Sequence, residues 1–555
     1  MAFLAVTLYA TAVAWLAGLA LFWALPLLRN YASARKMGVP IRVIPIDHTN
    51  PLWLLLDRKV LPVIARLLPF TRKSSFLRYN YRGWEMRERW APHHEMGDVF
   101  TIVTPKEVWL YLGDPDAVAD MFRRGRDEFP RCTRLTEMLN VFGPNISTAE
   151  GAQWRTHRKL VATCFTEQNN EIVWSEAINL ATDMIRYWST RKPLTSVDSD
   201  ARTLSLHVLS RAAFGKSFRF EGHDERKAEN PSKSYKESLQ TILENCILIV
   251  AFGPQTLARW KSYLPKKLAH VQEACDAFQK YMTSVYEAEK AASAGASSSS
   301  RHDHNLMTSL VRASQASESK AALTEQEIYG NMFVLNFAGH DTVSHTFTFA
   351  VYFLAAHPEV QDWVADELHQ VLGPGSDPAD WSYTRDFPKL KRCLAVLYET
   401  LRLYTPVPTS KWTDKASPAL KVGDKTVTIP PNTIVLPSYA CIQTDPRYWG
   451  DDSLSWRPQR WVDINEEWVA PRKGTFVGWS DGARDCPGKK FSQVEFVAAL
   501  AVMLRDWVVE PATFGRETLA DARKRVLDVI EKESTMILLL QMIHPERTPL
   551  VWKRR

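Results

Sequence analysis

One stretch of ten residues near the C-terminus, Trp479–Gly488, constrains this chain more than any other part of it. Its cysteine, Cys486, lies between two glycines, and glycines let a backbone bend tightly and approach a bulky group. Arg484, two residues earlier, carries a permanent charge that suits an anionic partner. A helix-like run, Phe491–Leu504, follows, and the positive end of its dipole favours a thiolate at the sulfur. The stretch therefore predicts a loop that presents a thiolate to a bulky anionic group.

A thiolate beneath a flat anionic macrocycle is a ligand of haem iron, and it pushes electron density toward bound oxygen. The competing interpretation is a free cysteine in a glycine turn, which an isolated Cys-x-Gly would favour. Here Cys486 is accompanied by Gly482 and Arg484 at a fixed spacing, and this combination favours the ligand.

The spacing resembles the haem-binding loop of the cytochrome P-450 family, in which an aromatic residue and two others precede Gly-x-Arg-x-Cys-x-Gly. The resemblance implies that haem b binds here, with Cys486 as the axial ligand of the iron. It also implies cofactor contacts from Gly482, Arg484 and Gly488. Trp479 stands where the family usually has Phe, and we expect its ring to cover the sulfur as Phe would.

Composition and charge are those of an ordinary globular protein. The 555 residues are 45% hydrophobic and 24% charged, with a formal net charge of +7. There is no long basic run or aromatic-interleaved basic stripe, which argues against nucleic acid and favours a membrane surface or an acidic protein as partner. The seven cysteines are scattered and form no Cys-x-x-Cys pair, which indicates a reducing compartment.

The N-terminal stretch Ala2–Leu28 contains no charged residue and exceeds the roughly 20 residues that a bilayer span needs. Arg29 and further basic residues follow, which places the rest of the chain on the cytoplasmic side. A cleaved signal peptide ending at Ala32–Ala34 is the alternative, but the apolar run is long and no basic residue precedes it. A second apolar stretch, Val60–Phe70, is too short to span and is either a core helix or a segment resting on the membrane.

Trp154 and Arg158 lie four residues apart in a helix-like stretch, Gln153–Phe165, and therefore share one face. An indole and a guanidinium can both donate to one carboxylate. The family has Trp-x-x-x-Arg here, and the resemblance implies that the pair binds a haem propionate. The alternative is a surface arginine stacked on an exposed tryptophan.

A long segment, Ile328–Ala356, is apolar nearly all round and free of proline, which predicts a buried helix. The four residues before it, Thr324–Glu327, form a capping box at its start.

The middle of this predicted helix carries the sequence Ala-Gly-His-Asp-Thr, a polar notch in an apolar rod. Asp341 there needs a partner, and the hydroxyl of Thr342 can bond back to the carbonyl four residues earlier. In the family this notch lies over the haem. The resemblance implies that Thr342 hydrogen-bonds dioxygen, that Asp341 gates protons from solvent, and that Ala338 lines the substrate pocket. A kinked core helix is the alternative, and His340 and His345 are expected to be pocket or core residues rather than metal ligands.

Lys389–Leu403 predicts another helix, in which Glu399 and Arg402 face the same way. The family completes this pair with an arginine from a later aromatic-x-Pro-Glu-Arg-aromatic element. Here that arginine is Arg460, and Gln459 replaces the usual Glu. The resemblance implies a structural triad behind the cysteine loop. The extended segment after this helix holds Val407, a candidate pocket residue.

The four motifs occur in the family's order, and the resemblance covers about residues 80–550. It implies a mainly α haem-thiolate fold with a small β region, preceded by one transmembrane helix. We expect an anchor at residues 1–29, a proline-containing hinge and membrane-proximal segment at 30–75, and the catalytic domain at 76–555.

The implied activity is that of a monooxygenase, which inserts one atom of O2 into a lipophilic small molecule such as a natural-product pathway intermediate. Because the chain holds no flavin- or dinucleotide-binding motif, electrons would come from NADPH through a separate reductase, with cytochrome b5 as a further donor. The implied location is the endoplasmic reticulum membrane, with a single span and the catalytic domain in the cytosol. Four basic residues next to the motifs are candidates for docking an acidic reductase: Arg155, Lys159, Lys489 and Lys490.

Two other functions stay open at this stage. A haem-thiolate isomerase or peroxygenase would need no reductase, but it would not need the proton delivery that Asp341 and Thr342 imply. A membrane haem protein that only binds or senses ligands would keep Cys486 and have no use for the notch.

Overall fold

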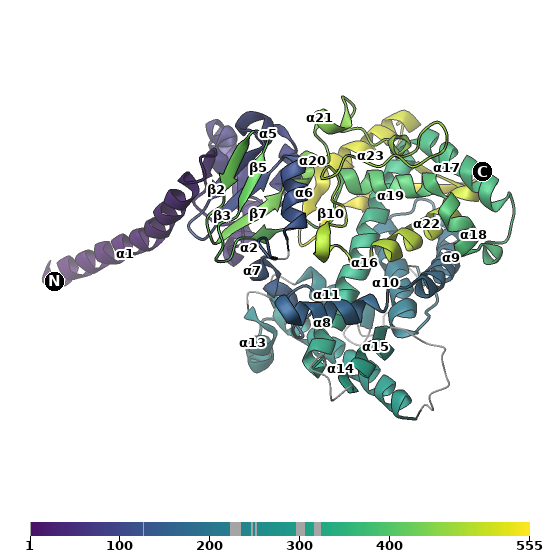
Figure 1. Cartoon of the computed structure of the whole chain (residues 1–555), viewed down its shortest axis with the longest axis horizontal. Coiled ribbons are helices and arrows are strands. Elements are labelled where there is room, and N and C mark those ends of the chain that lie inside the picture. Colours follow the sequence, from purple (N-terminus) through teal and green to yellow (C-terminus); the bar gives the residue numbers. More distant parts are fainter. Residues whose placement is uncertain are drawn as a thin grey trace. The chain divides into compact units, whose positions relative to one another are not determined.

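The computed structural model is mainly helical and consists of two compact units (Figure 1). It describes residues 2–125, 127–222, 235–245, 248–249, 252–295, 306–315 and 323–555. The sheet unit comprises Met1–Cys132, Pro408–Leu454 and Pro471–Asp485. The helical unit comprises Thr133–Val407, Ser455–Ala470 and Cys486–Arg555.

The sheet unit contains one main sheet, the strand pair β5–β6 and several helices, most of which are short. Its elements are α1 (Ala2–Arg35), β1 (Ile41–Val43), α2 (Pro51–Leu67), α3 (Ser75–Tyr79), α4 (Trp84–Glu88), α5 (Ala91–Met96), β2 (Val99–Val103), β3 (Val108–Leu112), α6 (Pro115–Arg123), β4 (Lys411–Trp412), β5 (Ala419–Val422), β6 (Lys425–Thr428), β7 (Thr433–Pro437), α20 (Tyr439–Ile442) and α21 (Pro446–Trp449).

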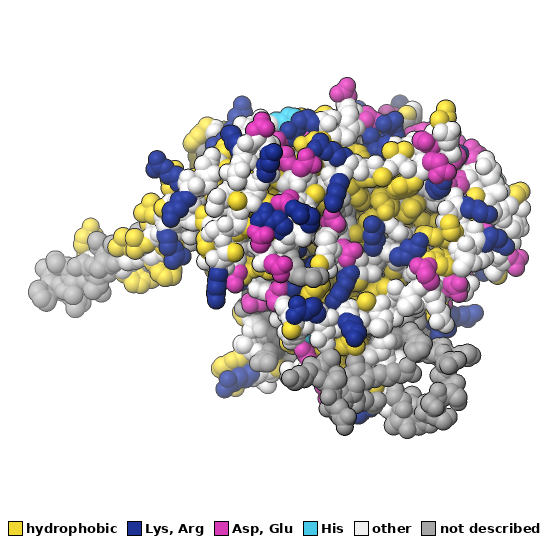
Figure 2. Space-filling model, in the orientation of Figure 1, with side chains coloured by type: hydrophobic (Ala, Val, Ile, Leu, Met, Phe, Trp, Pro, Cys, Tyr) yellow, Lys and Arg dark blue, Asp and Glu magenta, His cyan; other side chains and the backbone are white. Residues whose placement is uncertain are grey.

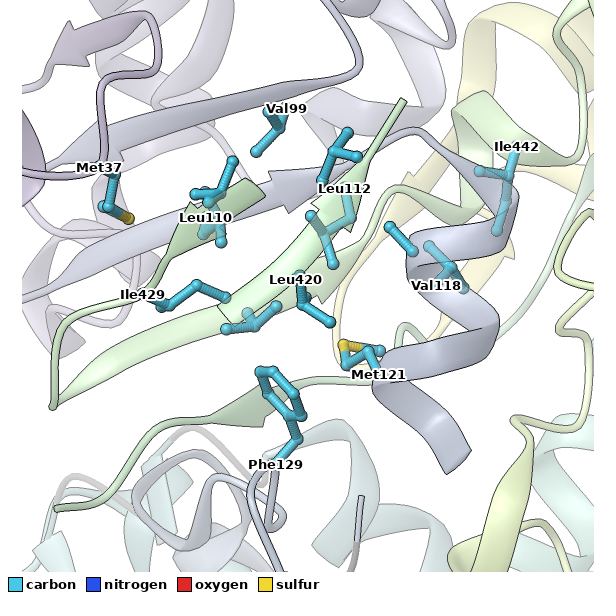
Figure 3. Close-up of a cluster of buried hydrophobic side chains, with 14 of the residues drawn as sticks. Met37, Val99, Leu110, Leu112, Val118, Met121, Phe129, Leu420, Ile429 and Ile442 are labelled. Atoms are coloured by element: carbon cyan, nitrogen blue, oxygen red, sulfur yellow. The ribbon is translucent and has the colours of Figure 1, made fainter. Parts of the chain in front are cut away.

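The main sheet has the strand order β1-β2-β3-β7-β4. Strands β2 and β3 are antiparallel, whereas β7 returns parallel to β3. Asp114 caps α6 by accepting from the N–H of Ala117, and Pro115 occupies the first turn. Residues of α6 such as Val118 and Met121 then pack with Leu110 and Leu420 from the strands into one core (Figure 3).

The N-terminal helix α1 (purple in Figure 1) covers the stretch for which the sequence predicts a membrane anchor. Among the residues that the structure describes, no helix is both long and apolar enough to cross a membrane. Most side chains of the first twenty residues, and with them much of the predicted span, lie outside the described part. The second apolar stretch forms the end of α2 and the turn after it. Leu61 packs there with Trp53 and Leu77, while Phe70 is exposed.

The helical unit holds most of the long helices and two small antiparallel strand pairs. Its elements are α7 (Thr133–Thr136), α8 (Gly151–Ala162), α9 (Glu167–Thr190), α10 (Val197–Phe214), α11 (Tyr235–Glu244), α13 (Pro254–Arg259), α14 (Lys266–Gly295), α15 (Leu306–Gln315), α16 (Glu325–Ala356), α17 (Pro358–Leu372), α18 (Tyr383–Asp386), α19 (Lys391–Leu403), α22 (Lys489–Asp506), β8 (Trp507–Pro511), α23 (Leu519–Glu533), β9 (Ser534–Met536), β10 (Leu540–Met542) and β11 (Leu550–Arg554). Strand β8 pairs with β11, and β9 pairs with β10.

Helix α16 is the central element of this unit and packs against α10, α19 and α23 (Figure 1). The predicted capping box is confirmed, because Thr324 and Glu327 bond to each other's backbone N–H groups. Nearly all of α16 is buried, so its apolar side chains contact neighbouring elements on every side of the helix.

Helix α22, which follows the cysteine loop, packs against α9 and α17. It contains Glu495, whose side chain is wholly buried. Burial raises the pKa of this carboxyl to about 8. The side chain is therefore mostly a neutral acid at pH 7, and its burial needs no counter-ion.

Candidate functional site

Cys486 differs from the other described cysteines in its exposure. It is half-buried, whereas Cys132, Cys164, Cys275, Cys393 and Cys441 are all buried. Burial raises the pKa of the Cys164 and Cys275 thiols to about 12, so these two stay protonated at neutral pH. Among the cysteines that the structure describes, Cys486 is therefore the one that can present its sulfur to a ligand.

The helix after the loop begins close to this sulfur. Helix α22 starts at Lys489, whose N–H donates to the carbonyl of Cys486 at 3.4 Å. A side chain at Gly488 would lie 3.9 Å from Sγ of Cys486 and 3.5 Å from the ring of Phe165. Both are ordinary contact distances, so the glycine leaves the position beside the sulfur without a side chain.

The first part of the loop belongs to the sheet unit, since the boundary between the units falls after Asp485. Gly482 has a φ of +74°, and a Cβ on it would lie 2.5 Å from the carbonyl oxygen of Phe122 in α6. Only glycine fits both restrictions. Arg484 is half-buried. The ring of Trp479 packs edge-on against Phe476 at 6.1 Å, and its predicted contact with the sulfur stays a prediction.

The surface of α16 is buried except at its start and at the predicted notch, where an exposed part of the helix, the window, remains. Beyond the first turn of this helix, the residues that are not buried are Ala338, Gly339 and Thr342. The hydroxyl of Thr342 donates to the carbonyl of Ala338 at 2.8 Å, which is the back-bond that the sequence predicts. The window is small, apolar at Ala338 and polar at Thr342.

These observations fit a haem with a thiolate ligand. The helical unit offers an accessible thiol beside a glycine, and an open stretch on a helix that is otherwise buried. Together these features suit a flat macrocycle that is held by sulfur. Within the described residues, no cluster of histidine, cysteine and carboxylate side chains could hold a bare metal ion.

Trp154 and Arg158 lie on α8, with Trp154 buried and Arg158 half-buried. A polar network fixes this helix to the start of α16. His157, between them on α8, contacts the side chains of Asn331 at 2.8 Å and Glu327 at 3.3 Å. Gln153 also donates to Glu327, at 2.7 Å. The network sets the position of the predicted propionate-binding pair relative to the window.

Asp341 faces three nitrogen-bearing side chains through a single oxygen, Oδ1. Arg202 Nε lies 3.4 Å away, His340 Nε2 3.6 Å and His345 Nε2 4.0 Å. Burial raises the pKa of Asp341, but attraction to these groups outweighs it, so the pKa lies below its usual value. Burial lowers the pKa of His345 to about 3, which leaves its ring neutral at neutral pH. The permanent charge facing the Asp341 carboxylate is therefore that of Arg202.

The predicted triad residues meet around the carboxylate of Glu399, which is fully buried. Arg402 donates to both carboxylate oxygens at 2.8 Å, and Arg460 Nε donates to Oε1 at 2.9 Å. Burial raises the pKa of Glu399, but the two arginines outweigh it and hold the pKa below its usual value.

Two further donors to Glu399 do not follow from the family pattern. The indole of Trp461 donates to Oε2 at 3.0 Å, and the backbone N–H of Arg457 donates to Oε1 at 2.9 Å. The position of Trp461 next to Arg460 is the sequence signal that could have indicated the indole contact. Next to the triad, Tyr398 accepts a hydrogen bond of 3.0 Å from Gln493 of α22, so the triad helix is tied to the helix after the cysteine loop.

The remaining pocket candidate, Val407, is exposed in the helical unit. The preceding carbonyl, that of Pro406, accepts a hydrogen bond of 3.0 Å from the N–H of Leu540 in β10. Residues of the β9–β10 hairpin and the candidate pocket segment are therefore neighbours.

Known proteins match most of this chain, including the site residues described above. The family model "Cytochrome P450" matches residues 76–538. A cytochrome P450 monooxygenase of Arthrobotrys oligospora is 26% identical, and the match covers 94% of each chain. The phomenoic acid biosynthesis cluster cytochrome P450 monooxygenase of Leptosphaeria maculans is 30% identical over 90% of this chain and 91% of the relative. A cytochrome P450 monooxygenase of Penicillium roqueforti is 29% identical over 85% and 86%.

Proposed function

Because the chain belongs to the cytochrome P450 family, we infer that it is a haem-thiolate monooxygenase that inserts one atom of O2 into a lipophilic small molecule. The observation that carries this is the pairing of an accessible cysteine with the Ala338–Thr342 window in one unit. A protein that only binds haem would need the accessible cysteine but not the window.

Each predicted residue has a task toward the cofactor. Cys486 would hold the iron, the charge of Arg158 would neutralise a propionate, and the indole of Trp154 would help to orient it; the charge of Arg484 suits the anionic cofactor. Haem, when bound, supplies the chemistry that activates dioxygen. The chain contributes the proton path, in which Thr342 Oγ1 lies at the open window and Asp341 adjoins it.

Replacing Thr342 by alanine tests the proton path. Without its hydroxyl, proton delivery becomes disordered, and NADPH should be consumed with release of peroxide. We expect product per NADPH to fall roughly tenfold or more, since a positioned proton donor contributes about 10²–10⁴-fold. Haem content and the carbon monoxide spectrum should stay unchanged. Thr348→Ala, one of the back-bonding threonines of α16 that is buried away from the window, is the matched control. A Thr342→Ala enzyme that remains coupled would contradict the proton path. Product that forms without NADPH, at the same rate in Thr342→Ala, would favour an isomerase or a peroxygenase, and unchanged ligand binding with no product would favour a binding protein.

We propose that electrons reach the site from NADPH through a separate reductase, with cytochrome b5 as a further donor. The four basic residues beside the motifs, Arg155, Lys159, Lys489 and Lys490, are all exposed in the helical unit, as an acidic partner would require. On the face shown in Figure 2, basic and acidic side chains are interspersed, which does not suit a polyanion such as nucleic acid.

Neutralising Lys489 and Lys490 to glutamine should slow reduction of the haem by the reductase. Because charge steering is screened by salt, the salt dependence of the reduction rate should weaken as well. Stopped-flow reduction at two ionic strengths measures both, with exposed Lys425→Gln and Lys421→Gln on the β5–β6 hairpin as controls. Equal rates for the double variant and the wild type would remove these lysines from the interface.

We also propose that Ala2–Leu28 anchors the chain in the endoplasmic reticulum membrane by a single span, with the catalytic domain on the cytosolic side. The uncharged stretch and the basic residues after it support this orientation. Alkaline extraction of microsomes is the measurement, and release of the full-length protein into the soluble fraction would contradict an integral span.

The substrate class is lipophilic, and we propose an intermediate of natural-product biosynthesis. The support is the relative of Leptosphaeria maculans, whose name assigns it to a biosynthesis cluster. Expression of the chain with a reductase, followed by product screening, identifies the substrate. The reduced carbon monoxide difference spectrum is the first check, because a band at the position of histidine-ligated haem would exclude Cys486 as the ligand.

A further inference from the structure

A cavity of about 290 Å³ lies beside α16 in the helical unit. Asp198 and Arg202 from α10, His340, Asp341 and His345 from α16, and Gln541 from β10 provide its polar wall. Leu206 of α10, Gln240 and Leu243 of α11, and apolar residues in and next to the β9–β10 hairpin complete the lining. Its volume is enough for several water molecules, each of which occupies about 30 Å³. Ala338 and Thr342 are not among its lining residues, so the cavity and the window are reached from different sides of one helix.

Asp341 is the residue that connects these two sides. Its carboxylate is in the wall of the cavity, and the next residue along the chain, Thr342, opens at the window. Its Oδ1 lies between 3.4 and 4.0 Å from the three nitrogen groups of Arg202, His340 and His345. A carboxylate in this place can take up a proton from water in the cavity and release it toward Thr342 Oγ1, which restores the carboxylate and leaves the number of protons unchanged.

Arg202 makes two different contacts. Its Nη2 donates to Oε1 of Gln541 at 3.0 Å. Its Nε lies 3.4 Å from Asp341 Oδ1 but makes no hydrogen bond with any described residue, although it is buried. The contact with Asp341 is therefore one of charge, and the orientation of the guanidinium is set by the hairpin. A buried N–H without an acceptor is unfavourable by about 1–3 kcal/mol, so the arrangement persists because other contacts fix it.

We propose that Arg202 is the positioning residue of the proton path: it keeps the Asp341 carboxylate ionised and turned to the cavity, and Gln541 fixes Arg202 in that position. The proposal rests on the proposed function for its role in catalysis. The ionic contact itself does not depend on that function and can be tested separately. Gln541 links the path to the hairpin whose backbone also bonds the Pro406 segment beside Val407, so displacement of the hairpin by a substrate would move Arg202.

The ionic contact is tested by unfolding as a function of pH. In the wild type, Asp341 stabilises the fold above its unfolded pKa, and this contribution is lost as the pH falls through its lower folded pKa. In Arg202→Gln, the permanent charge that opposes burial is removed, so the folded pKa of Asp341 should rise and less of this contribution should remain at neutral pH. The difference in unfolding midpoint between the two proteins should therefore widen from pH 4 to pH 7. In an Asp341→Asn background, the same substitution should give a difference that does not change with pH. The other charged or titratable groups facing Asp341, namely Asp198, His340 and His345, are present in all four proteins.

The catalytic role is tested in the reconstituted enzyme. Arg202→Gln should raise the peroxide fraction of consumed NADPH about fivefold, by the same loss of ordered proton transfer that Thr342→Ala causes. It should also shift the pH profile of coupling upward by about one unit. Arg202→Lys retains the charge and should restore the pH profile, and Gln541→Leu should increase peroxide release while the carbon monoxide spectrum is unchanged. Arg186→Gln, at an exposed arginine of α9, is the control.

The outcomes separate the two proposals. A pH-independent difference in unfolding, or additive effects of Arg202→Gln and Asp341→Asn on coupling, would overturn the role of Arg202 even in an active monooxygenase. If the pH dependence of unfolding changed as expected but no substrate were oxidised, the ionic contact would be supported and the proposed function would be contradicted.

Discussion

Replacing Glu399 by alanine is expected to prevent the accumulation of folded haem protein. The carboxylate is the common acceptor for Arg402, Arg460, Trp461 and the backbone N–H of Arg457. Its removal leaves the guanidinium of Arg402 buried without a counter-charge. Breaking a buried ion pair from one side costs about 3–5 kcal/mol. A typical fold is stable by only about 5–15 kcal/mol in total, so most of the margin would be lost.

The substitution Glu399→Gln separates shape from charge at this position. An amide fills the same space, but its NH2 group would face donors and the two arginines would lose their counter-ion. We expect it to be nearly as damaging as alanine. Urea unfolding of the holoprotein and the yield of bound haem measure the effect.

A carboxylate in an exposed ion pair provides the comparison for Glu399. Asp528 pairs with Lys532 at 3.1 Å on the surface of α23, and Asp528→Ala should change stability by less than about 0.5 kcal/mol. Loss of less than 1 kcal/mol in Glu399→Ala would show that the cluster does not stabilise the core.

The local features of the site follow from short sequence patterns. The capping box before α16 and the back-bond of Thr342 to Ala338 are each set by residues within five positions of one another. Such contacts depend on spacing along the chain and little on the rest of the fold, and the sequence predicts them for that reason.

Contacts between distant segments are of another kind. His157 meets Asn331 across 174 positions, and Arg202 meets Gln541 across 339. Neither pair has a pattern in the sequence, because the packing of whole helices brings them together. Glu495 is a related case: it lies on a helix where a charged residue would normally face water, and its burial becomes evident only from the neighbours of α22.

Replacing Cys486 by serine should abolish monooxygenation and the thiolate band of the reduced carbon monoxide spectrum. A serine hydroxyl has nearly the same size but is not ionised at neutral pH, so it cannot supply the electron density that a thiolate gives to the iron. The propionate contacts predicted for Trp154 and Arg158 would remain, so we expect weakened haem binding in a protein that still folds.

A second cysteine provides the control for Cys486→Ser. Cys275 is buried in α14, and burial raises the pKa of its thiol to about 12. It therefore remains a protonated core residue, and Cys275→Ala should keep both the thiolate band and activity, with a modest loss of stability from the small cavity. If Cys486→Ser kept the thiolate band while Cys275→Ala lost it, the ligand would be assigned to the wrong sulfur. If both variants kept it, a cysteine outside these two would have to bind the iron. The partial exposure of Cys486 argues for the expected result, because a ligand can reach a half-buried sulfur more readily than the buried sulfur of Cys275.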